Sequence, residues 1–172
     1  RPSKARGRTI HLLCVAHLSP RKAQHHLVDA LSDLRDYSWH CTLAGSLDRD
    51  EHYAHELRGI IVSLGLEHRI SLAGELDDTE LASAYRKADV FVLPSVYEGY
   101  GMVIDEAIAA GLPVITTDGG ALSTTGLRPG VRQYPAGDVA ELRACLEDWL
   151  SDPVALGEAA TQARQASCSL RS

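Results

Sequence analysis

The sequence lacks any apolar run long enough to cross a membrane, and its first residues contain no apolar segment typical of a secretion signal. It also lacks an excess of positive charge, because the formal net charge is −6. This balance argues against nucleic-acid binding and against a broad contact with anionic membranes. The sequence starts at Arg1 without a Met, as a piece of a longer protein would.

Cysteine is scarce, and none of the four residues forms a C-x-x-C pair: Cys14, Cys41, Cys145 and Cys168. Three of them fall at apolar positions of expected strands or of an expected helix. We therefore expect buried, reduced thiols and a reducing, cytoplasmic compartment, with neither a disulfide framework nor a zinc site. His52 and His55 share one face of an expected helix. Without the H-E-x-x-H arrangement of zinc hydrolases, we expect both at the surface.

Apolar segments without polar–apolar alternation recur through the whole chain. A length of 172 residues with 45% hydrophobic residues is enough for one good core. Apolar segments of this kind are typical of strands that are covered on both faces. We predict strands at 9–16, 39–45, 69–73, 88–94, 113–117 and 131–134.

Segments with helical periodicity alternate with these strands. We predict helices at 22–36, 48–64, 79–87, 102–110, 138–150 and 155–166, with a frayed end at 167–172. The alternation favours an α/β fold with a parallel sheet, helices on both faces and right-handed crossovers. We expect the doubly wound, Rossmann-like version with about six strands; the flavodoxin-like strand order is the alternative.

The stretch 88–117, ADVFVLPSVYEGYGMVIDEAIAAGLPVITT, organises the rest of the chain. It reads as a buried strand, a turn with Gly99 and Gly101, a helix, and a second buried strand. A strand that leads into a helix through glycines places free backbone N–H groups and the positive end of the helix dipole at one point, which suits phosphate. Two carboxylates flank this point, Glu98 before the turn and Glu106 within the helix.

The segment EGYGMVIDEA resembles the E-x7-E signature of retaining glycosyltransferases with the GT-B fold, in the large family 4, or group 1. The flanking ADVFVLPS and EAIAAGLPVI follow the same family pattern, and Asp118-Gly119-Gly120 resembles its glycine pair near the donor sugar. The resemblance spans roughly 9–152 and matches only the C-terminal, donor-binding half. It implies a nucleotide diphosphate sugar as co-substrate, no cofactor, no metal, and transfer to a hydroxyl with retained anomeric configuration.

The resemblance also implies an organisation and a set of partners. Residues 1–8 would be a tail or the remains of an interdomain linker, 9–152 the nucleotide-sugar binding domain, and 153–172 a C-terminal helix with a frayed end. The N-terminal, acceptor-binding half is missing from this sequence, so we expect little or no transferase activity from the isolated domain. Peripheral membrane contact, common among lipid-directed relatives, would run through that missing half.

The family assigns roles to individual residues. By this resemblance Lys22 would approach the diphosphate, whose developing negative charge needs cationic hydrogen bonds; Arg21, which is not part of the family pattern, can help to supply them. Glu98 approaches the donor sugar and Glu106 binds the ribose; Glu98 and Lys22 are the candidate catalytic residues. We prefer a front-face mechanism, in which the leaving phosphate helps to deprotonate the acceptor, to a nucleophilic Glu98 of the glycosidase kind. The other expected contacts are the amides at the helix start and the loop at the nucleotide base: Tyr100, Gly101, Met102, Val103, Leu76 and Asp77.

Several residues depart from the family pattern. In the first loop Ala16, His17 and Ala23 replace a glycine, an arginine and a second glycine. His17 can still hydrogen-bond a phosphate, but it is charged only part of the time near neutral pH. Residues 121–123 read Ala-Leu-Ser, where the family more commonly has a hydrophobic residue followed by Pro and Glu. These departures keep open a non-catalytic nucleotide-binding or scaffolding domain, and plain helix capping is an equal alternative for Asp77.

Two enzymatic alternatives agree less well with the sequence. A nucleotide-binding oxidoreductase would carry G-x-G-x-x-G after the first strand, where this sequence reads HLSPRK. A GT-B phosphorylase would need a lysine in a sequence context suited to pyridoxal phosphate, and this sequence has no such lysine. For the donor, GDP-mannose and UDP-linked sugars both remain open.

Overall fold

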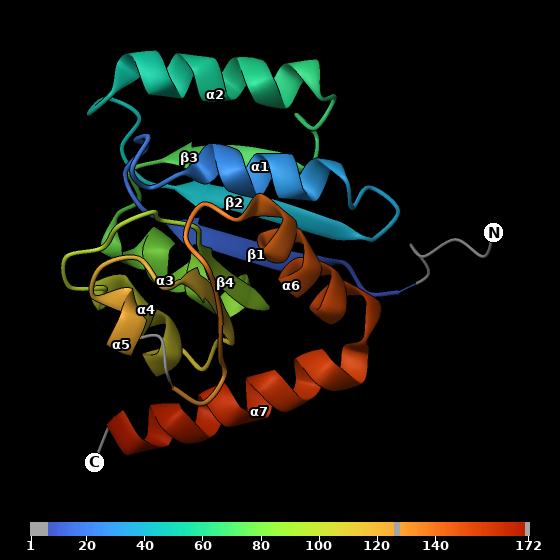
Figure 1. The fold of residues 1–172 in the computed structure, drawn as a ribbon, viewed down its shortest axis with the longest axis vertical. Helices are drawn as coiled ribbons and strands as arrows, with labels where there is room; N and C mark the ends of the chain where they lie inside the picture. The colour runs from blue at the N-terminus through green and yellow to red at the C-terminus, as the bar shows by residue number, and fades with distance from the viewer. Residues whose placement is uncertain (1–6, 126–127, 171–172) are drawn as a thin grey trace.

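A six-stranded parallel sheet forms the centre of the computed structural model, which describes residues 7–125 and 128–170 (Figure 1). The strand order is β3-β2-β1-β4-β5-β6, which is doubly wound and differs from the flavodoxin-like order. The strands are β1 (Ile10–Val15), β2 (Trp39–Ala44), β3 (Ile70–Gly74), β4 (Val90–Leu93), β5 (Val114–Thr117) and β6 (Val131–Tyr134). Each overlaps a predicted strand, so the fold class is confirmed.

Helices cover both faces of this sheet. They are α1 (Gln24–Ser32), α2 (Glu51–Ser63), α3 (Asp78–Lys87), α4 (Met102–Ala109), α5 (Leu122–Thr125), α6 (Val139–Ser151) and α7 (Pro153–Leu170). The helices α1, α2 and α6 lie on one face and α3 and α4 on the other, while α7 contacts both α4 and α6 (Figure 1). Within the described residues, none of these helices combines the length and apolarity of a membrane span.

The core consists of two apolar clusters, one on each face of the sheet. The strand β1 contributes Leu12 and Cys14 to the cluster with α1, α2 and α6, and Leu13 to the cluster with α3 and α4. Successive side chains of a strand point to opposite faces, so a strand covered on both sides has to be apolar at nearly every position. This explains why the strands appear in the sequence as continuous apolar runs.

Several observed boundaries differ from the predicted ones, among them those of α1, which runs from Gln24 to Ser32 rather than over 22–36. The helix α2 begins at Glu51 rather than at 48, because the Asp50 side chain accepts a hydrogen bond from the Tyr53 N–H at 2.9 Å and caps the helix. The helix α7 continues to Leu170, where we expected fraying, and the Ser167 hydroxyl anchors its end by donating to the Ala109 carbonyl at 2.9 Å. The short α5 was not predicted. Residues 1–6 of the expected tail and 171–172 lie outside the described residues.

All four cysteines are free thiols, and three of them are buried. Burial raises the pKa of Cys14 to about 12 and raises the pKa of Cys41 and Cys145 above the usual thiol value. The thiolate is the nucleophilic form, so these three thiols should be inert in the folded protein. Cys168 lies on the exposed side of α7.

We therefore expect a thiol reagent such as Ellman's to titrate one cysteine in the native protein at mildly alkaline pH and all four after denaturation. The Cys168→Ser variant should lose the fast native reaction, because the three remaining thiols are buried and protonated. Fast labelling that persists in this variant would contradict the arrangement of the core.

Candidate functional site

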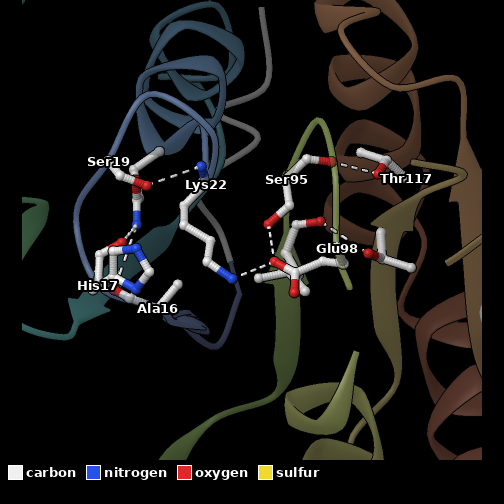
Figure 2. Close-up of polar contacts among 10 residues, drawn as sticks. Ala16, His17, Ser19, Lys22, Ser95, Glu98 and Thr117 are labelled. Atoms are coloured by element: carbon white, nitrogen blue, oxygen red, sulfur yellow. Dashed lines mark hydrogen bonds and ion pairs between the residues drawn. The ribbon is translucent and has the colours of Figure 1, made fainter. Parts of the chain in front are cut away.

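Three loops meet at the carboxyl edge of the sheet, where β1, β4 and β5 end side by side. They are the loops at 16–23 after β1, 94–101 after β4 and 118–121 after β5. Open parallel sheets bind ligands outside this edge, at the point where the strand order reverses. That point lies here between β1 and β4, and Figure 2 shows side chains of these loops pointing toward one another.

An ion pair joins the first two loops. Lys22 Nζ bonds to Glu98 Oε1, and both side chains are largely buried, with exposed fractions of 13% and 9%. The Ser95 hydroxyl donates to the same Glu98 oxygen at 2.7 Å (Figure 2). The Val96 N–H adds a bond to the Arg21 carbonyl at 3.0 Å. Two donors thus occupy Glu98 Oε1, which leaves Oε2 as the acceptor for a further partner.

The third loop is tied to the second through Thr117. Its hydroxyl donates to the Ser95 carbonyl at 2.5 Å and accepts a hydrogen bond from the Gly119 N–H at 3.2 Å. The Ala121 N–H donates to the Glu98 carbonyl at 2.8 Å. These bonds hold the backbone on both sides of the Glu98 side chain, so the carboxylate is positioned before any ligand binds.

The glycine pair after β5 is required by the close approach of these two loops. A Cβ atom at Gly119 would lie 2.2 Å from the Val96 carbonyl oxygen, and one at Gly120 would lie 2.4 Å from the Glu98 carbonyl oxygen. Gly120 also has a φ of +62°, which disfavours other residues. By contrast, nothing lies within 4 Å of a Cβ added at Gly99. The pair that we noted in the sequence therefore has a local steric reason.

The loop after β1 contains a strained residue where the family has its second glycine. Ala23 adopts a left-handed conformation with a φ of 55°, which costs a residue other than glycine roughly 1–2 kcal/mol. This turn explains why α1 begins at Gln24 rather than at Lys22. The buried Gln24 side chain steadies the loop, since its Nε2 donates to the His17 carbonyl at 3.0 Å and to the Ala16 carbonyl at 3.4 Å.

His17 lies beside several positive groups. Burial, and then the charges of Lys22, Arg49 and Arg21, lower its pKa below the usual histidine value, with Glu98 acting in the opposite sense. At neutral pH the imidazole is therefore mostly neutral. It offers a hydrogen bond to an anion rather than the fixed charge of the family's arginine. Arg21 is exposed at the same loop.

The start of α4 provides backbone donors next to the ion pair. Gly101 is the N-cap with a φ of 68°, and no side chain caps this end. The N–H groups of Met102 and Val103 belong to the first turn, where a helix offers no internal partner. Tyr100 and Met102, on either side of the buried Gly101, are exposed by 83% and 67%, so the side chains at this helix end face solvent.

The remaining candidate residues lie apart from the ion pair. Glu106 is exposed on α4, and its Oε2 accepts a hydrogen bond from the Tyr85 hydroxyl at 3.3 Å. The Asp77 carboxylate caps α3 in a capping box, which confirms the capping interpretation for this side chain. Leu76 lines a pocket of about 400 Å³ at the carboxyl ends of β1, β2 and β3, together with His17, Arg49 and Glu75.

Sequence reasoning did not identify three supporting residues, Ser95, Thr117 and Tyr85. A signal existed for the first two, because they are small polar residues at the carboxyl ends of apolar strands, where ligands bind. Tyr85 lies on the apolar side of α3 and carries no such signal. Within the described part of the chain, no group of three or more His, Cys, Asp or Glu side chains is placed to hold a metal ion.

The sheet, its strand order and the loops at its carboxyl edge define a Rossmann-like α/β domain. Residues 1–167 match the family model described as glycosyl transferases group 1. Because this match covers nearly the whole sequence, the chain belongs to the group 1 glycosyl transferases.

Three known proteins are similar to the chain. Glycogen synthase of Mycobacterium tuberculosis (strain ATCC 25618 / H37Rv) is 36% identical over 162 residues, or 90% of this chain and 37% of that protein. The structure of Anabaena HepE in complex with UDP and glucose is 27% identical with a TM-score of 0.80, over 94% of this chain and 44% of HepE. The C-terminal domain of LpcC, a group 1 family protein of Francisella tularensis, has a TM-score of 0.84 at 22% identity, over 93% of this chain and 85% of that structure. The chain thus spans less than half of the first two proteins, and its fold is that of a C-terminal GT-B domain.

The close approach at Gly119 can be tested with two alanine variants. Gly119→Ala should lower the free energy of unfolding by about 3 kcal/mol, because the added methyl group meets backbone that cannot move aside. Gly99→Ala, in open space on the neighbouring loop, should change it by less than about 0.5 kcal/mol. Urea denaturation measures both, and equal effects would contradict the packing of the loops.

The buried ion pair can be tested by a double-mutant cycle. Lys22→Met leaves a buried carboxylate without its cation and should cost about 3 kcal/mol of stability. In the Glu98→Gln background the same change should cost less, with a coupling of about 1–3 kcal/mol. The surface pair of Arg143 and Asp33 is the control, because its side chains are 47% and 63% exposed and its coupling should be below about 1 kcal/mol. Additive effects at Lys22 and Glu98 would refute the pair.

Proposed function

We propose that this chain is the donor-binding domain of a retaining hexosyltransferase, which moves a sugar from a nucleotide diphosphate sugar to a hydroxyl acceptor. The observation that carries the proposal is the buried pair of Lys22 and Glu98 beside the uncapped start of α4. A cation, helix N–H groups and a carboxylate are thereby gathered at the ligand-binding edge of the sheet. Membership of the group 1 family and the UDP and glucose named for HepE support the same interpretation.

The diphosphate of the donor binds between Lys22 and the start of α4. Lys22 carries three N–H donors and uses one of them for Glu98, so it can donate to a phosphate oxygen without leaving the carboxylate. The N–H groups of Tyr100, Gly101, Met102 and Val103 and the dipole of α4 add to this attraction. Together they stabilise the negative charge that develops as the diphosphate leaves.

Glu98 acts on the donor sugar through its second oxygen. With Oε1 occupied by Lys22 and Ser95, Oε2 accepts a hydrogen bond from a sugar hydroxyl. A carboxylate held in this way by two donors is a weak nucleophile. This arrangement supports a front-face mechanism, in which the leaving phosphate takes the proton of the acceptor hydroxyl.

The nucleoside extends from the diphosphate along the carboxyl edge. Glu106 accepts hydrogen bonds from the ribose hydroxyls, and the base occupies the pocket of about 400 Å³ beside Leu76. The backbone of Leu76 and the carbonyl oxygen of Asp77 read the base, because the Asp77 carboxylate and N–H are both used in the capping box. His17 and Arg21 complete the diphosphate site. Both GDP-mannose and UDP-linked sugars are reasonable donors.

In this proposal residues 9–152 form the donor-binding domain, 1–8 belong to a linker or tail, and α7 (Pro153–Leu170) packs on the domain. The acceptor would be bound by an N-terminal half, and peripheral membrane contact would also belong to that half. The isolated domain should therefore bind the donor and transfer little or none of it.

A non-catalytic nucleotide-binding or scaffolding domain is the second candidate. It is favoured by the left-handed Ala23, where glycine would relieve strain, and by the mostly neutral His17 in place of a cation. A domain that has lost the activity could keep the fold with such replacements. Donor binding separates the proposal from a silent scaffold, which should not discriminate among nucleotides. A nucleotide-binding domain that has lost the activity would bind the donor but transfer no sugar when an N-terminal half is added.

Calorimetric titration with GDP, UDP, GDP-mannose and UDP-glucose tests the proposal. One nucleotide series should bind saturably, and Glu106→Ala and Lys22→Ala should each weaken binding by at least about tenfold, the loss of a charge-assisted hydrogen bond. The matched controls are Glu158→Ala and Lys87→Ala, which remove the same charges at exposed helix positions away from the edge. Circular dichroism checks that Lys22→Ala remains folded. Equal losses in variants and controls, or no binding by the wild-type protein, would contradict a donor site in this chain.

A further inference from the structure

Tyr85 forms a polar contact that connects the core to the candidate site. It lies in the last turns of α3 and is 9% exposed, and its hydroxyl donates to Glu106 Oε2 on α4 at 3.3 Å. Its ring stacks on Phe91 of β4, with ring centroids 6.0 Å apart and planes inclined by 14°. The ring is thus fixed by packing, and the hydroxyl is fixed with it.

The Tyr85 hydroxyl is well suited to remain a donor. Burial, and then the negative charge of Glu106, raise the pKa of this hydroxyl above the usual tyrosine value. The hydroxyl therefore stays protonated at every pH at which the protein functions. A neutral O–H beside a carboxylate has one favourable arrangement, in which the tyrosine donates and the glutamate accepts.

This contact reduces the entropy that the exposed Glu106 side chain loses when it binds a ligand. A free glutamate side chain has several rotatable bonds, and ordering it costs up to about 2 kcal/mol. When that cost falls on the binding step, the affinity is reduced by the same amount. A hydrogen bond from a rigid tyrosine orders the carboxylate during folding, before a ligand binds.

We propose that Tyr85 is a positioning residue, which orients the Glu106 carboxylate for the two ribose hydroxyls of the donor nucleotide. The inference rests on the proposed function, because it takes Glu106 as the ribose acceptor. Tyr85 itself contacts no substrate. Its hydroxyl uses one lone pair of Oε2 and leaves Oε1 and the remaining lone pair for a diol.

A purely structural tyrosine would have a different signature. The Tyr85 ring belongs to the apolar cluster with Phe91 and Ile104, and this packing is kept when phenylalanine replaces tyrosine. A packing role alone therefore predicts that Tyr85→Phe binds every nucleotide as the wild-type protein does. A positioning role predicts a loss that depends on the ribose hydroxyls.

The test compares Tyr85→Phe with the wild-type protein in titrations with UDP and GDP and with the 2′,3′-dideoxy form of each. For the ribonucleotide that binds, the Kd should rise about threefold to tenfold, the effect of one lost hydrogen bond. For its dideoxy form the Kd should change less than about twofold, since this form has no ribose hydroxyls to donate hydrogen bonds to Glu106. Tyr37→Phe is the matched control, because it also removes a bond from a buried tyrosine hydroxyl to a glutamate, Glu147 at 2.9 Å, and Tyr37 precedes β2, at the amino edge of the sheet.

The outcomes distinguish a failure of the nucleotide site from a failure of the positioning role of Tyr85. If neither UDP nor GDP binds the wild-type protein, the nucleotide site fails and the ribose role fails with it. If a ribonucleotide binds and Glu106→Ala weakens it, but Tyr85→Phe has no effect or weakens the dideoxy form equally, the positioning role alone is overturned. A loss in Tyr85→Phe that is absent in Tyr37→Phe and vanishes with the dideoxy nucleotide supports it.

Discussion

The pairing of Lys22 with Glu98 is the contact on which the arrangement of the carboxyl edge depends. The two residues are 76 positions apart in the sequence, and both are largely removed from water. A buried charge without its partner is unfavourable by several kcal/mol, so the loops after β1 and β4 cannot separate without a large cost. The bonds of Ser95 and Thr117 extend this constraint to the loop after β5.

Close backbone approach is a second constraint, separate from the ion pair. The loops after β4 and β5 come together at Gly119 and Gly120, where a single methyl group would overlap carbonyl oxygens. The sheet supplies rigid strand ends, the glycines permit contact, and the polar side chains then have fixed partners. A site built in this way is organised before a ligand arrives, which lowers the entropy lost on binding.

The fold could be predicted from the sequence because its signals are local and repeated. Continuous apolar strands, helical periodicity and glycine turns all indicate the same doubly wound sheet. The motif residues Glu98 and Glu106 were visible through the family resemblance of the whole segment, because two glutamates eight apart mean little alone. Tyr85, Ser95 and Thr117 were not, because their roles arise from contacts between segments distant in sequence. The left-handed Ala23 was also invisible, since alanine carries no sign of such a conformation.

The last helix has a consequence for how the molecule comes apart. Leu156 and Ala159 of α7 belong to the apolar cluster on one face of the sheet, and Ala166 packs against the cluster on the other. Detachment of α7 would therefore expose both halves of the core at once. Because α7 packs on the apolar clusters of both faces, the molecule should unfold in a single cooperative transition, with no stable intermediate that keeps one face intact.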